Sequence, residues 1–161
     1  MAKYESDIKY IAAPAERVYE KLSNLENFRP MLENAQNNPA LREKMKEAGQ
    51  DPADLDRLRD VELTNDSITV PAPMVGQLGM QIIEREPFKT IKFETTQSPI
   101  QANLWIQILP SSQAYTPDGS LGAKIKLTLK ADLNPMFKMM LGSKFSEGIN
   151  KFADMLAMMP Y

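Results

Sequence analysis

The clearest pattern along the chain is a stretch of helical periodicity over residues 134–159. Asn134 is a suitable N-cap and Pro135 a suitable first helical residue, so the start of this helix is marked chemically. When residues are spaced at about 100° on a helical wheel, one apolar sector contains Phe137, Leu141, Phe145, Gly148, Ile149, Phe152, Met155, Leu156 and Met159. The pattern predicts one long amphipathic helix, which needs a sheet to lie on.

Much of the preceding chain alternates between apolar and polar residues, which is typical of strands with one buried face. We predict seven strands, over residues 4–12, 61–64, 67–70, 77–85, 90–96, 100–109 and 121–133. In the first strand the alternation puts Ser6 and Tyr10 on the inner face, and a loop is predicted over 110–120. A single polar face on each strand predicts an antiparallel sheet covered on one side, and the long helix is the obvious cover.

Helical spacing also follows the first strand. Val18, Leu22 and Leu25 predict a short helix, and a second brief helical segment follows around Pro30. Residues 33–60 differ from the rest, because twelve of these 28 residues are charged and few are apolar. We interpret them as a surface insertion that forms a lid or rim, with helices over 39–48 and 52–58, within a single domain spanning 1–161.

Composition narrows the possible functions. The net charge of −2 and the pI near 5.3 argue against nucleic acid as a partner, because phosphate binding needs a basic face. No apolar run is long enough to span a membrane, and the charged first residues lack the apolar core of a signal peptide, so a cytoplasmic protein is expected. Cysteine and histidine are both absent, which removes thiolate nucleophiles, Cys/His zinc sites and the most common general base.

Several stretches carry a family resemblance. Residues 11–22 (Ile-Ala-Ala-Pro-Ala-Glu-Arg-Val-Tyr-Glu-Lys-Leu) lead from the first strand into the first helix, residues 83–93 (Ile-Glu-Arg-Glu-Pro-Phe-Lys-Thr-Ile-Lys-Phe) form a predicted hairpin, and the last helix follows Leu-Lys-Ala-Asp-Leu at 129–133. With the order of elements, they resemble the START-like (SRPBCC) superfamily, which includes birch-pollen-allergen-like proteins and polyketide cyclases. The resemblance covers nearly the whole chain.

This resemblance implies an α+β helix-grip fold, in which a curved seven-stranded antiparallel sheet wraps around the C-terminal helix. It also implies an apolar cavity between sheet and helix for a lipid-like or aromatic molecule. Members of the superfamily serve as carriers, sensors, cyclases, hydrolases and chaperone-associated modules, so the fold leaves the function open. The residues expected to contact a ligand are Tyr10, Met80, Ile82, Phe93, Leu104, Ile106, Leu127, Phe145, Ile149 and Phe152.

Three functions follow as alternatives. The first is non-covalent binding of a hydrophobic small molecule, as carrier or sensor, by a monomer or homodimer without cofactor or metal. The second is a cyclase- or dehydratase-type enzyme that uses Tyr10 or Glu84 as acid or base. The third is an interaction module with a filled core, in which the insertion over 33–60 or the outer face of the last helix docks a partner. Candidate contacts are Met136, Met139 and Met158, which lie outside the apolar sector, and Trp105 on the outer sheet face. For the apolar residues of the helix, the structural alternative is simple packing in the core. For Trp105, it is a ring that rests on the aliphatic part of surface lysine side chains.

Overall fold

The computed structural model describes residues 2–49, 61–72, 76–97, 100–158 and 161. Within these residues the strands are β1 (Ala2–Glu5), β2 (Lys9–Ile11), β3 (Glu62–Leu63), β4 (Ser67–Ala72), β5 (Gly76–Glu86), β6 (Thr90–Gln97), β7 (Ala102–Tyr115) and β8 (Leu121–Ala131). The helices are α1 (Ala15–Leu22), the 3-10 helix η1 (Leu25–Phe28), α2 (Arg29–Gln36), α3 (Pro39–Glu47) and α5 (Pro135–Met158). Among the described helices, none is long and apolar enough to cross a membrane.

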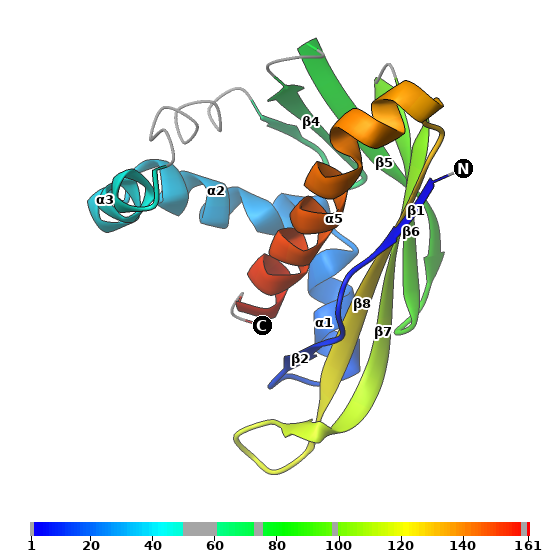
Figure 1. Cartoon of the computed structure of the whole chain (residues 1–161). Coiled ribbons are helices and arrows are strands. Elements are labelled where there is room, and N and C mark those ends of the chain that lie inside the picture. Colours follow the sequence, from blue (N-terminus) through cyan, green and yellow to red (C-terminus); the bar gives the residue numbers. More distant parts are fainter. Residues whose placement is uncertain (1, 50–60, 73–75, 98–99, 159–160) are drawn as a thin grey trace.

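All strands pair antiparallel in one curved sheet, in the order β1-β8-β7-β6-β5-β4-β3, and β2 pairs with the other end of β8. The helix α5 lies across the concave face of this sheet, and α2 and α3 extend away from it (Figure 1). The predicted α+β helix-grip fold is therefore confirmed. The helix predicted over 52–58 and Met159, the last residue of the predicted apolar sector, lie outside the described residues.

The predicted first strand is divided in two, and the prediction for Tyr10 is wrong. Glu5 pairs with Thr128 and Lys9 pairs with Ile125, so four steps along the first strand match three steps along β8. One extra residue reverses the alternation of side chains, because successive residues of a strand point to opposite faces. Tyr10 consequently lies opposite Lys124 on the outer face and is 44% exposed, whereas Ile11 is buried.

Ser6 holds the junction between β1 and β2. Its backbone N–H donates to the Leu127 carbonyl over 2.9 Å, and its hydroxyl oxygen accepts from the Leu127 N–H, also over 2.9 Å. The same hydroxyl donates to the carbonyl of Asp7. The buried side chain therefore supplies the acceptor that a regular ladder would provide, which agrees with its predicted inward orientation.

Replacing Ser6 with alanine is expected to lower the free energy of unfolding by about 1–3 kcal/mol, because the buried Leu127 N–H would lose its acceptor. Urea unfolding of Ser6→Ala beside Ser143→Ala, at an exposed position of α5, measures the effect. Equal stability of the two variants would contradict the role given to the Ser6 hydroxyl.

The loop predicted over 110–120 is shorter in the structure, because β7 continues to Tyr115 and pairs with β8 around a bulge. The pairing of β7 with β6 ends at Gln107, and the Ile108 N–H still donates to the Lys89 carbonyl over 2.7 Å. From Leu109 onward no described strand pairs with this edge of β7, so proline is tolerated there. Pro110 therefore lies inside a strand, opposite Ala123. The remaining turn is closed by hydrogen bonds between Thr116 and Ser120, and the hairpin projects beyond the rest of the sheet (Figure 1).

The second half of α5 is fixed to the sheet by apolar and polar contacts. Ile149, Ala153 and Leu156 are buried against the sheet. On an adjoining face, the Asn150 amide oxygen accepts from the Asp7 N–H over 2.9 Å, and the Asp154 carboxylate lies 2.7 Å from the Lys9 ammonium. The hydrogen bond that the Lys9 ammonium donates to the Asp154 carboxylate raises the pKa of Lys9. These contacts set the position of α5 above the concave face.

Candidate functional site

A cavity of about 370 Å³ lies between the concave face of the sheet and α5. Strands β4 to β8 form its floor, α5 forms its roof, and η1 with the start of α2 closes one end. Its volume falls within the range of small-molecule pockets, about 300–1,000 Å³. The residues that line it are Leu25, Phe28, Leu32, Ile68, Met80, Phe93, Leu104, Ile106, Leu129, Lys144, Phe145, Gly148, Ile149, Phe152 and Met155.

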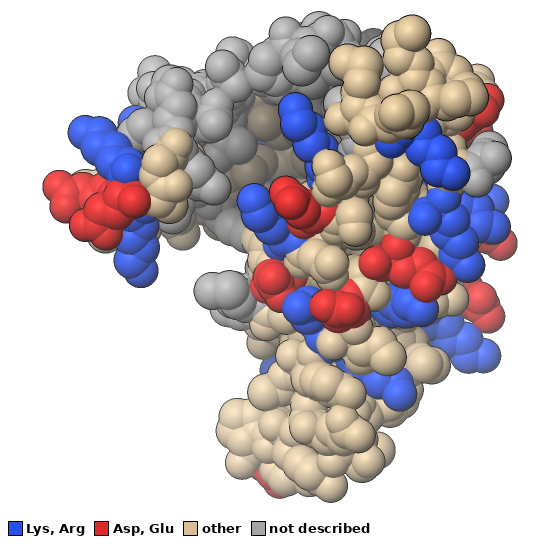
Figure 2. Space-filling model, in the orientation of Figure 1, with Lys and Arg blue, Asp and Glu red and all other residues tan. Residues whose placement is uncertain are grey.

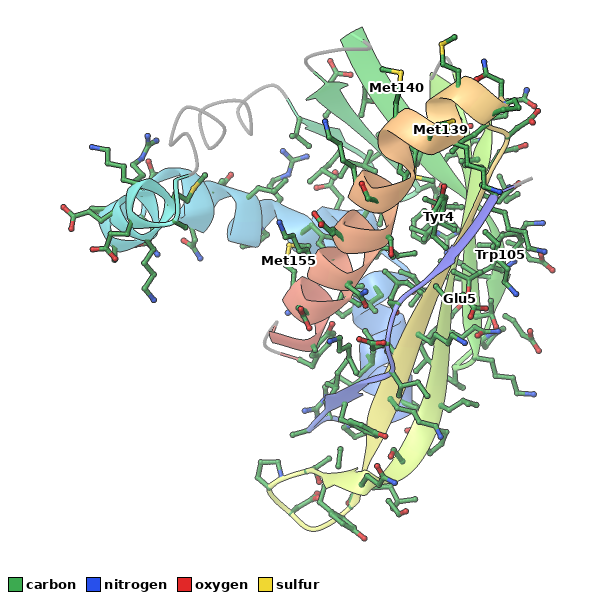
Figure 3. All side chains as sticks on the ribbon, viewed as in Figure 1. Tyr4, Glu5, Trp105, Met139, Met140 and Met155 are labelled. Carbon is green, nitrogen blue, oxygen red and sulfur yellow. The ribbon has the colours of Figure 1, made fainter. Side chains whose placement is uncertain are left out.

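The cavity has a buried wall and an exposed side. Phe93, Ile106 and Ile149 are among its buried residues. Lys144, Gly148 and Met155 of α5 are exposed to solvent, so they mark the mouth. Figure 3 shows Met155 beside the lower, C-terminal part of α5. A molecule entering past these residues would meet an apolar interior.

Seven of the ten residues predicted to contact a ligand lie together in this cavity. They are Met80, Phe93, Leu104, Ile106, Phe145, Ile149 and Phe152. Ile82 and Leu127 do not line it, because both are packed into the hydrophobic core. Tyr10 does not line it either, because the extra residue between β1 and β2 turns its side chain to the outer face. Ligand binding by the seven remains a prediction.

Sequence reasoning missed the end wall and the charged rim. Phe28 and Leu32 lie four residues apart around the start of α2, a spacing that brings both to one side of a helix. Ile68 of β4 alternates with polar neighbours, as a residue on the inner face should. Lys144 precedes Gly148 by four residues, so helical spacing alone could have placed it beside the apolar sector.

The groups considered for acid–base chemistry lie away from the cavity. Tyr10 faces outward, and Glu84 is exposed opposite Lys92 on the outer face. Among the described residues lining the cavity, none carries a hydroxyl or carboxyl group, and Lys144 is the single charged residue. The described part of the chain also contains no group of three carboxylate side chains placed to hold a metal ion. The geometry of the described cavity favours apolar contact over proton transfer.

Two exposed features lie outside the cavity. Trp105 lies on the outer face between two lysines, with the Lys92 and Lys130 ammonium groups 5.2 and 5.5 Å from the ring centroid. The structure thus agrees with the interpretation that Trp105 rests against lysines. The second feature is a set of exposed methionines, Met136, Met139 and Met140, on the first turns of α5, and Figure 3 shows the latter two at the upper end of the molecule.

Comparison with solved structures finds proteins of the same architecture. Norcoclaurine synthase from Thalictrum flavum, solved as a point mutant with a transition-state analogue, is 13% identical, with a TM-score of 0.57 over 98% of this chain and 94% of that one. The Aha1 dimer from Colwellia psychrerythraea is 11% identical, with a TM-score of 0.53 over 98% of both chains. XoxI from Bacillus cereus is 11% identical, with a TM-score of 0.57 over 98% of this chain and 94% of that one.

No family model matches the chain, and no curated protein matches it. At these low identities the structural likeness shows the fold alone. The chain has the same helix-grip fold as these proteins, which is the fold that the resemblance in its sequence implied.

Proposed function

We propose that the protein binds a hydrophobic small molecule, lipid-like or aromatic, in the cavity between the sheet and α5, as a carrier or sensor. The observation that carries this proposal is the apolar lining of a cavity of about 370 Å³. Burial of apolar surface stabilises a complex by about 25 cal/mol per Å² before the costs of association are subtracted. A cavity with so few polar groups would select ligands mainly by size and shape.

The flexible side chains in the wall suit ligands of varied shape. Met80 lies on the floor and Met155 at the mouth, and unbranched, polarizable methionine adapts to different apolar surfaces. The aromatic residues Phe28, Phe93, Phe145 and Phe152 offer further apolar contact area from both floor and roof. An enzymatic role has less support, because the described lining offers no hydroxyl or carboxyl group as acid or base.

Native mass spectrometry of the freshly purified protein, compared with its mass after denaturation, tests the proposal. We expect an adduct that is lost on denaturation, and the mass of this adduct would begin to identify the ligand. A bare protein that also fails to take up fatty acids and apolar dyes would overturn the proposal.

Lys144 leads to a prediction about the ligand's polar end. Its side chain contributes to the lining, and it makes no ion pair with another described residue. A long-chain carboxylic acid is expected to bind about threefold to fivefold more tightly than the alcohol of the same length, the equivalent of one exposed ion pair. Fluorescence displacement titration measures both affinities.

Lys144→Gln should remove this preference, whereas Lys151→Gln serves as the matched control. Lys151 is also exposed on α5, but it does not line the cavity. Equal affinities for acid and alcohol in the unmodified protein would show that Lys144 does not contact the ligand's polar end, while leaving apolar binding intact.

A further inference from the structure

The first turns of α5 expose three methionines that the fold does not cover. Met136, Met139 and Met140 are 67%, 87% and 57% exposed, respectively. We call these three residues the methionine face. Clusters of exposed apolar side chains are uncommon on globular proteins and often mark sites of interaction with a protein or a membrane.

The charged residues within the first turns of α5 are basic, and the nearest acidic residue in the sequence is the exposed Asp132, two residues before Asn134. Residues 133–146 contain Lys138 and Lys144 but no aspartate or glutamate, whereas residues 147–158 contain Glu147 and Asp154 against one lysine. The N-terminal end of a helix also carries a partial positive charge from its aligned peptide dipoles. Figure 2 shows an uncharged surface at the upper right of the molecule, with several basic side chains and an acidic one beside it. This end of α5 is thus complementary to an anionic surface.

We propose that the methionine face docks onto an anionic lipid bilayer. Unbranched apolar side chains can enter the boundary between head groups and acyl chains, while neighbouring lysines attract anionic head groups. A protein partner is less well supported, because residues 133–146 contain no tryptophan, tyrosine or arginine, the residues that dominate binding energy at protein interfaces. Methionine is enriched at such interfaces, but lysine is depleted there.

The position of the face relates docking to the cavity. Met140 lies one helical turn before Lys144 and Phe145, which belong to the cavity lining. A protein docked through the methionine face would therefore hold this part of the cavity close to the bilayer. Exchange of a lipid-like molecule between bilayer and cavity would require the proposed binding function. Docking of the methionine face onto the bilayer does not depend on that function.

Sedimentation with vesicles tests the proposal on the full chain. We expect binding to vesicles of equal parts phosphatidylcholine and phosphatidylserine at least about tenfold tighter than to phosphatidylcholine alone, and weakened by added salt. Replacing all three residues of the methionine face with glutamine should weaken binding at least about tenfold, because their apolar contact with the bilayer is lost. Lys138→Gln should weaken it about fivefold, the equivalent of one lysine near a charged surface.

The matched control replaces Leu109 and Leu121 with glutamine. Both are about half exposed on the β7–β8 hairpin, at the other end of the molecule, and this variant should bind vesicles like the unmodified protein. Failure of the unmodified protein to sediment with either vesicle, or equal binding by the methionine-face variant, would overturn the proposal. Uptake of a fluorescent fatty acid, measured without vesicles, tests the cavity separately, so failure of either proposal can be told from failure of the other.

Discussion

Replacing Gly148 with phenylalanine is expected to weaken ligand binding at least about tenfold while the protein stays folded, because an aromatic side chain would take up space that the ligand needs. Gly148 lines the cavity, and a Cβ atom at this position would have no neighbour within 4 Å. The new side chain therefore has room to enter the cavity. Glycine within a helix also costs about 1 kcal/mol relative to alanine, so replacing it should not destabilise α5.

Displacement titration with an apolar dye measures the loss, and circular dichroism checks the fold. Gly148→Ala is the first control, and it should raise the free energy of unfolding by about 0.5–1 kcal/mol with little change in affinity. Ser146→Phe is the second, because it adds the same ring at an exposed position of α5 that does not line the cavity. Unchanged affinity in folded Gly148→Phe would mean that the ligand does not occupy the part of the cavity beside Gly148.

Replacing Gly122 with alanine is expected to destabilise the protein by about 2–4 kcal/mol, through overpacking against atoms that cannot move independently. A Cβ atom on Gly122 would lie 2.5 Å from the carbonyl oxygen of Ile11 and 2.6 Å from that of Ala114. Both atoms belong to the backbone, so relief requires β2 or the extended end of β7 to shift. Chemical denaturation measures the loss.

Two other glycines serve as controls for Gly122→Ala. A Cβ atom at Gly119 would meet nothing within 4 Å, but its φ of +87° strains any other residue. Gly119→Ala should therefore cost about 1 kcal/mol, from backbone strain alone. Gly148→Ala should change stability in the opposite direction. A Gly122→Ala variant as stable as the unmodified protein would mean that β2 and β7 do not approach β8 this closely.

The alternation of side chains along the strands shows what a local sequence pattern can and cannot predict. Alternation in the last strand predicts seven inward residues, namely Leu121, Ala123, Ile125, Leu127, Leu129, Ala131 and Leu133. Ala123, Ile125, Leu127 and Ala131 are buried, because side chains on a strand alternate and one face meets the core, whereas Leu121 at the start of β8 is 49% exposed. The same reasoning placed Tyr10 on the wrong face. The inserted residue between β1 and β2 is defined by pairing with β8, more than a hundred residues away, and no local pattern records it.

The same division applies to the candidate site. Helical spacing in residues 134–159 was enough to predict Phe145, Ile149 and Phe152 on the face of α5 that covers the sheet, because 3.6 residues per turn brings them to one side. The end wall formed by Phe28 and Leu32 depends on how η1 and α2 are packed against the sheet. This packing is set by long-range contacts, including the hydrogen bond from the Leu25 N–H to the Asn65 carbonyl.

By itself, the sequence determined the α+β fold class, most strand boundaries, the long helix and which of its faces is apolar, since these depend on periodicity and on short-range turn and cap chemistry. Tertiary structure alone decided that β7 continues through Pro110, that Tyr10 turns outward, and that Lys144 stands at the mouth of an apolar cavity. Each of these features depends on which distant strand or helix packs against the segment. Such long-range pairing and packing is determined by contacts throughout the chain and not by local periodicity.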